Sequence, residues 1–217
     1  MYFNVNLGFV VMTPEEVETF ERCIAVGGVA LFPADTVYGL ATEPGSAEGV
    51  RRLYGLKGRR SDRPAAVMFF RLELALAAVP ELPALTREAL ERLLPGGVTV
   101  LVPNLARRFP LACADTPDVL GLRVPKLEGA LAPLADVSWP VLQSSANRSG
   151  EPEARRIEDV DASVRVGVDL ILDGGELPGT PSTIVDLTSY ARDESFEIVR
   201  EGAVPRDRVE AVLRSSR

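Results

Sequence analysis

The chain contains no histidine among its 217 residues, and it has only two cysteines. Without histidine, the Ser-His-Asp and Cys-His arrangements of nucleophilic catalysis are excluded, and so are zinc sites built on imidazole ligands. Cys23 and Cys113 lie far apart in the sequence and have no partners at the spacing of metal ligands, so we expect no metal site. Any proton transfer must therefore use a carboxylate, a lysine, a tyrosine or the substrate itself.

Long hydrophobic runs are also missing. No apolar segment approaches the roughly 18 residues that a membrane-spanning helix needs. The N-terminal sequence MYFNVNLGFVVM has neither the basic region nor the small-residue cleavage site of a secretory signal. The low cysteine content favours a protein whose thiols stay reduced. We therefore expect a cytoplasmic protein that does not contact membranes.

Apolar segments alternate with helical patterns along the whole chain, and 46% of the residues are hydrophobic. This predicts a single domain over residues 1–217 with a sizeable core. Strands are expected at residues 3–11, 29–32, 65–70, 98–102, 120–124, 140–143, 168–172, 182–187 and 196–199. Helices are expected at residues 14–26, 46–54, 72–79, 85–94, 127–135 and 205–213. The pattern indicates an α/β (α+β) fold with a twisted mixed parallel/antiparallel sheet flanked by helices.

Basic residues are concentrated in one segment of an otherwise acidic chain. The formal net charge is −7, but the segment from Arg51 to Arg63 holds six basic residues and a single acid. A helix expected to begin after Ser46 and to end at Gly55 leads into it. Arginine and lysine on a glycine-flanked turn suit a polyphosphate or another anion in a cationic concave groove. A solvated helix end, which also favours basic residues, explains the charge equally well.

Polar side chains lie where several predicted strands end. Residues 33–36 follow the first buried strand, at the position where α/β sheets place ligands. Residues 144–150 (SSANRSG) form a turn rich in hydroxyl and amide groups, which suits a phosphate or a nucleobase edge but is also typical of an ordinary turn. Arg123 lies in an apolar strand, so either a ligand carboxylate or a structural ion pair must satisfy it.

The motifs resemble those of one known family, although the chain has no Walker A sequence and no G-x-G-x-x-G after a strand. Residues 32–40 (FPADTVYGL) are similar to a P-T-[DE]-T-x-Y-G-L signature. Further similar segments follow in the family's order: residues 57–59 with 63–64, 95–99, 122–125, 145–150, 173–175, 182–186 and 199–203. Over about residues 15–209 the chain thus resembles the YrdC-like threonylcarbamoyl-AMP synthase family, in its short, single-domain form.

The resemblance implies an L-threonylcarbamoyladenylate synthase, a nucleotidyltransferase. Such an enzyme condenses L-threonine, bicarbonate and ATP, with Mg²⁺ on the triphosphate, to threonylcarbamoyl-AMP and pyrophosphate. A tRNA threonylcarbamoyl-transferase partner would then modify adenosine 37 of certain tRNAs, with tRNA or double-stranded RNA as a further partner. The implied catalytic residues are Lys57, Arg59, Ser145 and Asn147. The implied ATP-binding residues are these four with Arg63 and Arg200, and the implied threonine-binding residues are Thr36, Arg123 and Ser182.

The sequence departs from the family pattern at positions that bear on the amino acid. Ala34 stands where the family usually has threonine, and Met68 stands where many members place a histidine near the amino-acid pocket. We expect Met68 to make that wall apolar. Residues 153–155 (EAR) replace the usual S-P-T, and Pro181 replaces a common glutamate. These departures leave the amino-acid specificity open.

Two alternatives follow from the same residues. One is a divergent paralogue that acts on another carbamoyl acceptor. The other is a module that binds double-stranded RNA or tRNA through residues 51–63 and lacks this activity. Salt-dependent RNA binding without threonine-dependent release of pyrophosphate would favour the RNA-binding module.

Overall fold

The computed structural model describes residues 12–58, 60 and 63–214. It contains a nine-stranded sheet whose strands lie in the order β7-β1-β2-β6-β3-β5-β4-β8-β9. The strands are β1 (Ala30–Pro33), β2 (Tyr38–Thr42), β3 (Ala66–Met68), β4 (Val98–Pro103), β5 (Val119–Arg123), β6 (Val141–Ser145), β7 (Leu170–Ile171), β8 (Thr183–Asp186) and β9 (Glu197–Arg200). Three neighbouring pairs, β1–β7, β3–β5 and β4–β8, are parallel, and the others are antiparallel. The expected mixed sheet is therefore confirmed.

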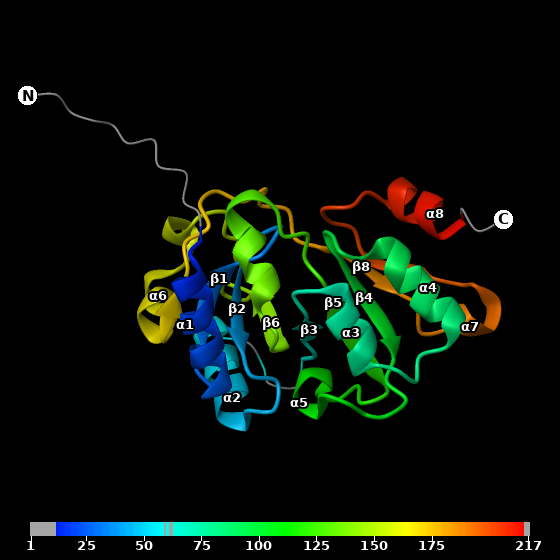
Figure 1. Cartoon of the computed structure of the whole chain (residues 1–217), viewed down its shortest axis with the longest axis horizontal. Coiled ribbons are helices and arrows are strands. Elements are labelled where there is room, and N and C mark those ends of the chain that lie inside the picture. Colours follow the sequence, from blue (N-terminus) through cyan, green and yellow to red (C-terminus); the bar gives the residue numbers. More distant parts are fainter. Residues whose placement is uncertain (1–11, 59, 61–62, 215–217) are drawn as a thin grey trace, which may run out of the picture.

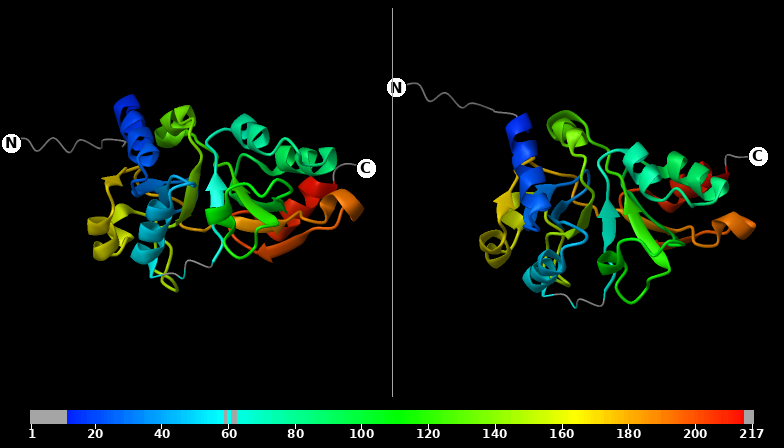
Figure 2. Two further views of the ribbon diagram at one scale, coloured as in Figure 1. Left: turned by 90° about the horizontal axis from the view of Figure 1, so that it is seen from below. Right: turned by 60° about the horizontal axis from the view of Figure 1, so that its bottom comes forward.

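Helices cover both sides of this sheet. The α-helices are α1 (Pro14–Ala25), α2 (Ala47–Lys57), α3 (Leu72–Ala78), α4 (Ala84–Leu93), α5 (Pro110–Cys113), α6 (Ala162–Gly167), α7 (Tyr190–Asp193) and α8 (Arg206–Arg214), and the 3₁₀ segments are η1 (Gly129–Asp136) and η2 (Ile157–Asp159). Figure 1 shows α1, α2 and α6 around β1 and β2, and α4, α7 and α8 at the opposite end, beside β4 and β8. In both views of Figure 2, α1, α3 and α4 lie on one side of the sheet and α2 and α5 on the other. None of the described helices has the length and apolar character needed to cross a bilayer.

The first helix begins where its sequence predicts. The Thr13 side chain accepts a hydrogen bond from the Glu16 backbone N–H at 3.2 Å, and the Glu16 carboxylate accepts one from the Thr13 backbone N–H at 2.7 Å. Pro14 occupies the first helical position, where no N–H is needed. The capping box therefore fixes the start of α1.

An aromatic cluster packs α1 onto the sheet. The ring centroid of Phe20 lies 5.4 Å from that of Phe32 on β1 and 5.8 Å from that of Phe70, which follows β3. All three side chains are buried, and offset or edge-on ring contacts add to the free energy of apolar burial. The cluster ties the N-terminal helix to the centre of the sheet.

Several elements differ from the sequence-based expectation. Strand β2 was not predicted; all of its residues are buried, so its sequence YGLAT shows no alternation of polar and apolar residues. Helices α6 and α7 were also missed, because they are only six and four residues long. The predicted helix at residues 127–135 is a 3₁₀ segment, since Pro133 inside it lacks the N–H that an α-helix requires. The strand expected at residues 3–11 lies outside the described residues.

Helix α2 continues past Gly55, where we expected it to end. It runs to Lys57, and Gly58 then adopts the left-handed conformation with φ of 59°. An added Cβ at Gly55 would meet nothing within 4 Å. The helix thus ends at the glycine whose backbone is left-handed, not at the first glycine in the sequence.

This geometry predicts opposite effects at the two glycines. We expect Gly55→Ala to raise the free energy of unfolding by about 0.5–1 kcal/mol, because alanine loses less backbone entropy in a helix. We expect Gly58→Ala to lower it by about 1–2 kcal/mol, because alanine resists the left-handed conformation. Urea unfolding midpoints measure both changes, and a lower midpoint for Gly55→Ala would contradict the helix boundary.

Candidate functional site

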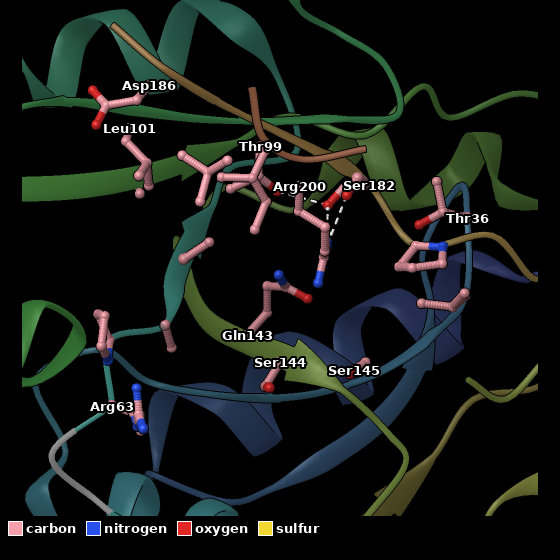
Figure 3. A pocket seen from close by; sticks show the side chains of 18 of the residues that line it. Thr36, Arg63, Thr99, Leu101, Gln143, Ser144, Ser145, Ser182, Asp186 and Arg200 are labelled. Carbon is pink, nitrogen blue, oxygen red and sulfur yellow. Dashed lines mark hydrogen bonds between the residues drawn. The ribbon is translucent and has the colours of Figure 1, made fainter. Parts of the chain in front are cut away.

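A cleft of about 550 Å³ opens over the middle strands of the sheet. Ala66 on β3 and Gly121 on β5 pair directly with each other, and Gln143 on β6 and Leu101 on β4 flank them in register. All four line the cleft. Because the two central residues carry almost no side chain, the sheet leaves a hollow there, toward which Gln143 projects (Figure 3).

One end of the cleft carries hydroxyl groups and a guanidinium. The Oγ1 atom of Thr99 lies 2.8 Å from the Oγ atom of Ser182, and Arg200 Nη2 donates to the Ser182 carbonyl oxygen at 2.7 Å. Thr36 lines the same end, and Arg200 points into the cavity (Figure 3). Burial lowers the pKa of Arg200, and the charge of Glu153 opposes that change. The arrangement suits a ligand that carries an anionic group and hydroxyls.

A lysine network fixes the turn that follows β6. Lys57 is only 3% exposed, and its Nζ atom donates to the carbonyl oxygens of Ser145 and Asn147, the latter at 2.8 Å. The Ser145 hydroxyl donates to Asn147 Oδ1 at 2.6 Å, and Asn147 Nδ2 donates to the Glu151 carbonyl oxygen at 2.5 Å. The hydrogen bonds of Lys57 and Asn147 therefore stabilise the turn. Ser145 lines the cleft, whereas Lys57 and Asn147 do not.

Backbone hydrogen bonds to Tyr38 hold together the two ends of the loop that follows this turn. The Ala146 backbone N–H donates to the Tyr38 carbonyl oxygen at 2.8 Å, and the Tyr38 N–H donates to the Ala154 carbonyl oxygen at 3.0 Å. The Tyr38 hydroxyl lies 3.1 Å from Asp173 Oδ1 and accepts a hydrogen bond from the Gly174 N–H at 3.0 Å. Burial raises the pKa of Tyr38. Tyr38 thus has a structural role.

Arg123 forms the structural ion pair that the sequence left open. It is 2% exposed, and its Nη2 atom donates to the Asp35 carboxylate and, at 2.8 Å, to the Thr36 hydroxyl. The second Asp35 oxygen accepts from the Lys126 N–H at 3.0 Å. Burial lowers the pKa of Arg123, while the Asp35 charge raises it. Arg123 is not among the residues lining the cleft, so its role in binding the threonine carboxylate stays a prediction.

Five of the predicted site residues lie at the cleft. Thr36, Arg63, Ser145, Ser182 and Arg200 line the cleft. Arg200, expected at the nucleotide, lies beside Ser182, expected at threonine. Arg59 lies outside the described residues.

Met68 does not line the cleft. It is fully buried in the core and pairs with Arg123 and Val141 in the sheet. An apolar wall at Met68 in the amino-acid pocket therefore stays a prediction. Thr99, which ends one of the family-like motifs, and Gln143 also line the cleft, although the sequence analysis assigned neither of them a role in the site.

The charges of the cleft are balanced among the described residues. Two arginines, Arg63 and Arg200, and two carboxylates, Glu153 and Asp186, line it. Elsewhere in the basic segment, Arg51 and Arg52 pair with Glu48 and Asp169. A cationic groove therefore stays a prediction. Within the described ranges, no three Cys, Asp or Glu side chains come together in a group that could hold a metal ion.

Comparison with known families decides the relationship. The Sua5/YciO/YrdC model, described as Telomere recombination, matches residues 22–202. The chain belongs to the Sua5/YciO/YrdC family. This confirms the resemblance seen in the sequence motifs, and it agrees with the fold.

Curated members of the Sua5/YciO/YrdC family carry the name threonylcarbamoyl-AMP synthase. The chain is 28% identical to the one from Pyrococcus abyssi over 205 residues, which cover 92% of this chain and 59% of that protein. It is 31% identical to the one from Pseudomonas aeruginosa PAO1 over 170 residues, which cover 77% of this chain and 90% of that protein. It spans 53% of the length of the Bacillus subtilis protein. The chain therefore matches little more than half of the longer family members.

Solved structures of the Sua5/YciO/YrdC family share the fold. The crystal structure of P. abyssi Sua5 complexed with L-threonine superposes with a TM-score of 0.80 at 26% identity, covering 93% of this chain and 58% of that chain. The solution structure of MTH1692 from Methanobacterium thermoautotrophicum gives 0.63 at 29% identity, covering 95% of both chains. Escherichia coli YciO gives 0.73 at 22% identity, covering 88% of this chain and 91% of that one, and shows the fold alone.

Proposed function

We propose that this chain is an L-threonylcarbamoyladenylate synthase, which forms threonylcarbamoyl-AMP and pyrophosphate from L-threonine, bicarbonate and ATP. The observation that carries the proposal is the 31% identity over 90% of the P. aeruginosa threonylcarbamoyl-AMP synthase. The P. abyssi Sua5 structure with bound L-threonine supports the amino acid. The cleft, with its hydroxyls and guanidinium groups, supports a substrate that carries carboxylate and phosphate.

The proposed chemistry suits a chain without histidine. Threonine and bicarbonate lose water to give N-carboxy-threonine, whose carboxylate attacks the α-phosphate of ATP and displaces pyrophosphate. This nucleophile is already an anion, so no general base is needed at the attack. The tasks left to the protein are positioning, charge neutralisation and exclusion of water.

The cleft divides these tasks between its two sides. Thr36 and Ser182 would hold the threonine side chain, with Arg200 beside them. Arg63 and Ser145 would face the phosphates. Lys57 would keep the turn at Ser145 in place through its hydrogen bonds to the backbone carbonyl oxygens. Mg²⁺ entering with the triphosphate would supply further positive charge at the phosphates.

The product also defines a partner. Threonylcarbamoyl-AMP is a reactive mixed anhydride, so a transferase that acts on adenosine 37 of tRNA would have to accept it directly. Such a pathway belongs in the cytoplasm.

The test is release of pyrophosphate from ATP and bicarbonate with each amino acid in turn. We expect kcat/KM for threonine to exceed that for valine by more than about 200-fold, the upper limit for a pocket that reads shape alone. Serine, which lacks only a methyl group, should fall behind by about 10–200-fold.

Equal rates with valine and threonine would contradict hydroxyl recognition and favour a divergent paralogue. Salt-dependent RNA binding without threonine-dependent pyrophosphate release would favour the RNA-binding module.

A further inference from the structure

Residues 172–182, the crossing segment, connect β7 at one edge of the sheet to β8, the second strand from the other edge. Figure 1 shows this segment passing from the side of β1 to β8. Its last two residues, Pro181 and Ser182, line the cleft. The position of the crossing segment therefore sets one wall of the cleft.

A backbone hydrogen bond links the crossing segment to the opposite side of the cleft entrance at Thr36. The Gly179 N–H donates to the Thr36 carbonyl oxygen at 2.8 Å. Thr36 lines the cleft, and its hydroxyl accepts a hydrogen bond from Arg123 at 2.8 Å. The positions of Thr36 and Ser182, two of the predicted threonine-binding residues, thus depend on where the crossing segment lies.

Arg155 contacts the crossing segment at three residues. Its carbonyl oxygen accepts a hydrogen bond from the Leu177 N–H at 2.9 Å, and its Nε atom donates to the Leu177 carbonyl oxygen at 3.3 Å. Its Nη2 atom donates to Glu176 Oε1 at 2.7 Å. A Cβ at Gly179 would lie 2.4 Å from Arg155 Cγ and Cδ, so the arginine stem lies directly against this glycine. Arg155 therefore holds the segment just where Gly179 bonds to Thr36.

The backbone from which this side chain extends is itself held in place. The Arg155 N–H donates to Asp159 Oδ2 at 3.0 Å. The carbonyl oxygen of the preceding residue, Ala154, accepts from the Tyr38 N–H at 3.0 Å. Arg155 thus joins the crossing segment to a fixed part of the sheet.

We propose that Arg155 is a positioning residue for amino-acid binding, which docks the crossing segment and so keeps Thr36 and Ser182 in place before the substrate arrives. This rests on the proposed function. Fixing binding groups in advance reduces the entropy lost on binding. The sequence EAR at residues 153–155, which departs from the family's usual S-P-T, thereby acquires a role.

Arg156, the next residue, pairs with the same carboxylate but contacts the segment differently. Its Nη2 atom donates to Glu176 Oε2. This hydrogen bond is the main cause that holds the pKa of Glu176 below its usual value, and the charge of Arg155 contributes less. The hydrogen bonds to Leu177 come from Arg155. Neutralising Glu176 thus falls chiefly to Arg156, and docking the segment falls to Arg155.

The experiment compares wild type with Arg155→Ala, which loses the side-chain hydrogen bonds and the stem contact. Calorimetry measures the affinity for L-threonine in the presence of a non-hydrolysable ATP analogue, and the affinity for the analogue alone. We expect threonine affinity to fall by about 3- to 10-fold, because binding must then also order Thr36 and Ser182. Affinity for the analogue should change by less than about 2-fold, since Arg63 and Ser145, proposed to face the phosphates, lie outside the crossing segment.

Arg156→Ala is the matched control, since it removes the neighbouring arginine and leaves the bonds to Leu177 in place. Its threonine affinity should change by less than about 2-fold. Arg155→Lys restores the stem and a charge for Glu176, and it should recover part of the lost affinity. The side chains of Arg155 and Glu176 are 53% and 44% exposed, so the melting temperature of Arg155→Ala should fall by no more than about 4 °C.

Amide hydrogen exchange, followed by NMR, gives a readout that needs no substrate. Loss of docking should speed exchange of the Gly179 N–H, which is bonded to the Thr36 carbonyl oxygen, in Arg155→Ala. Exchange of the same N–H should not change in Arg156→Ala.

Three results would overturn the assignment while leaving the proposed function intact. The first is unchanged threonine affinity or unchanged Gly179 exchange in Arg155→Ala. The second is an equal loss of threonine affinity in Arg156→Ala, which would assign the effect to the charge on Glu176. The third is an equal loss of affinity for the ATP analogue, which would show a general disturbance of the cleft. If wild type binds no amino acid, the proposed function and the role in amino-acid binding fall together, and the exchange rates still decide whether Arg155 docks the segment.

Discussion

Replacing Asp35 with alanine is expected to lower the free energy of unfolding by about 3–5 kcal/mol. Asp35 neutralises Arg123, whose side chain is 2% exposed. The substitution leaves a buried guanidinium without its counter-charge, and the Lys126 backbone N–H also loses its acceptor. Urea unfolding followed by circular dichroism measures the change through the unfolding midpoint.

Two controls separate the buried charge from other effects. Adding Arg123→Met to Asp35→Ala should recover part of the lost stability, because it removes the uncompensated charge. Asp118→Ala breaks the exposed pair with Arg107, whose side chains are 69% and 75% exposed for Arg107 and Asp118. That loss should stay within about 0.5 kcal/mol. A loss below about 1 kcal/mol for Asp35→Ala, or no recovery in the double variant, would contradict the account.

Gly202→Ala is expected to reduce kcat/KM for threonine-dependent pyrophosphate release by about 100-fold, through displacement of the cleft wall. A Cβ at this position would lie 2.2 Å from the Pro181 carbonyl oxygen and 2.7 Å from the Ser182 carbonyl carbon. The Gly202 N–H also donates to Thr183 Oγ1 at 3.0 Å, so the two segments are docked together. Because these are backbone atoms and cannot rotate away, the segment at Pro181 and Ser182 must move apart from the end of β9, which carries Arg200.

Gly55→Ala is the control, since its added methyl group meets nothing and lies away from the cleft. It should leave kcat/KM unchanged. Calorimetry with threonine and a non-hydrolysable ATP analogue shows whether Gly202→Ala lowers the affinity for threonine. If Gly202→Ala retains activity within a factor of three of wild type, the close approach of residues 181–183 and 202 does not position the site.

Interactions between residues close in sequence were readable from the chain. The capping box at Thr13 depends on Glu16 three residues later, and it sets the start of α1 as predicted. The strands expected at residues 182–187 and 196–199 are present as β8 and β9, which pair antiparallel. The end of α2 was not predicted correctly, because both Gly55 and Gly58 can end a helix and only the backbone geometry distinguishes them.

The motifs named residues from distant parts of the sequence, and four of them, Thr36, Ser145, Ser182 and Arg200, line the same cleft. Their binding roles stay predictions. Their partners were not predicted. Lys57 is directed to the Ser145 and Asn147 carbonyl oxygens, which removes it from the cleft lining. A lysine in a basic segment gives no sign in the sequence of which acceptor it will find.

The sequence by itself determined the family, the mixed sheet, the absence of histidine chemistry and most helix and strand positions, because each depends on composition or on residues within a few positions of one another. Only the tertiary structure decided that Arg123 pairs with Asp35, 88 positions away, and that Ala66 and Gly121 meet to hollow out the cleft. Strand register and burial set those contacts, and many registers are compatible with the same apolar segments.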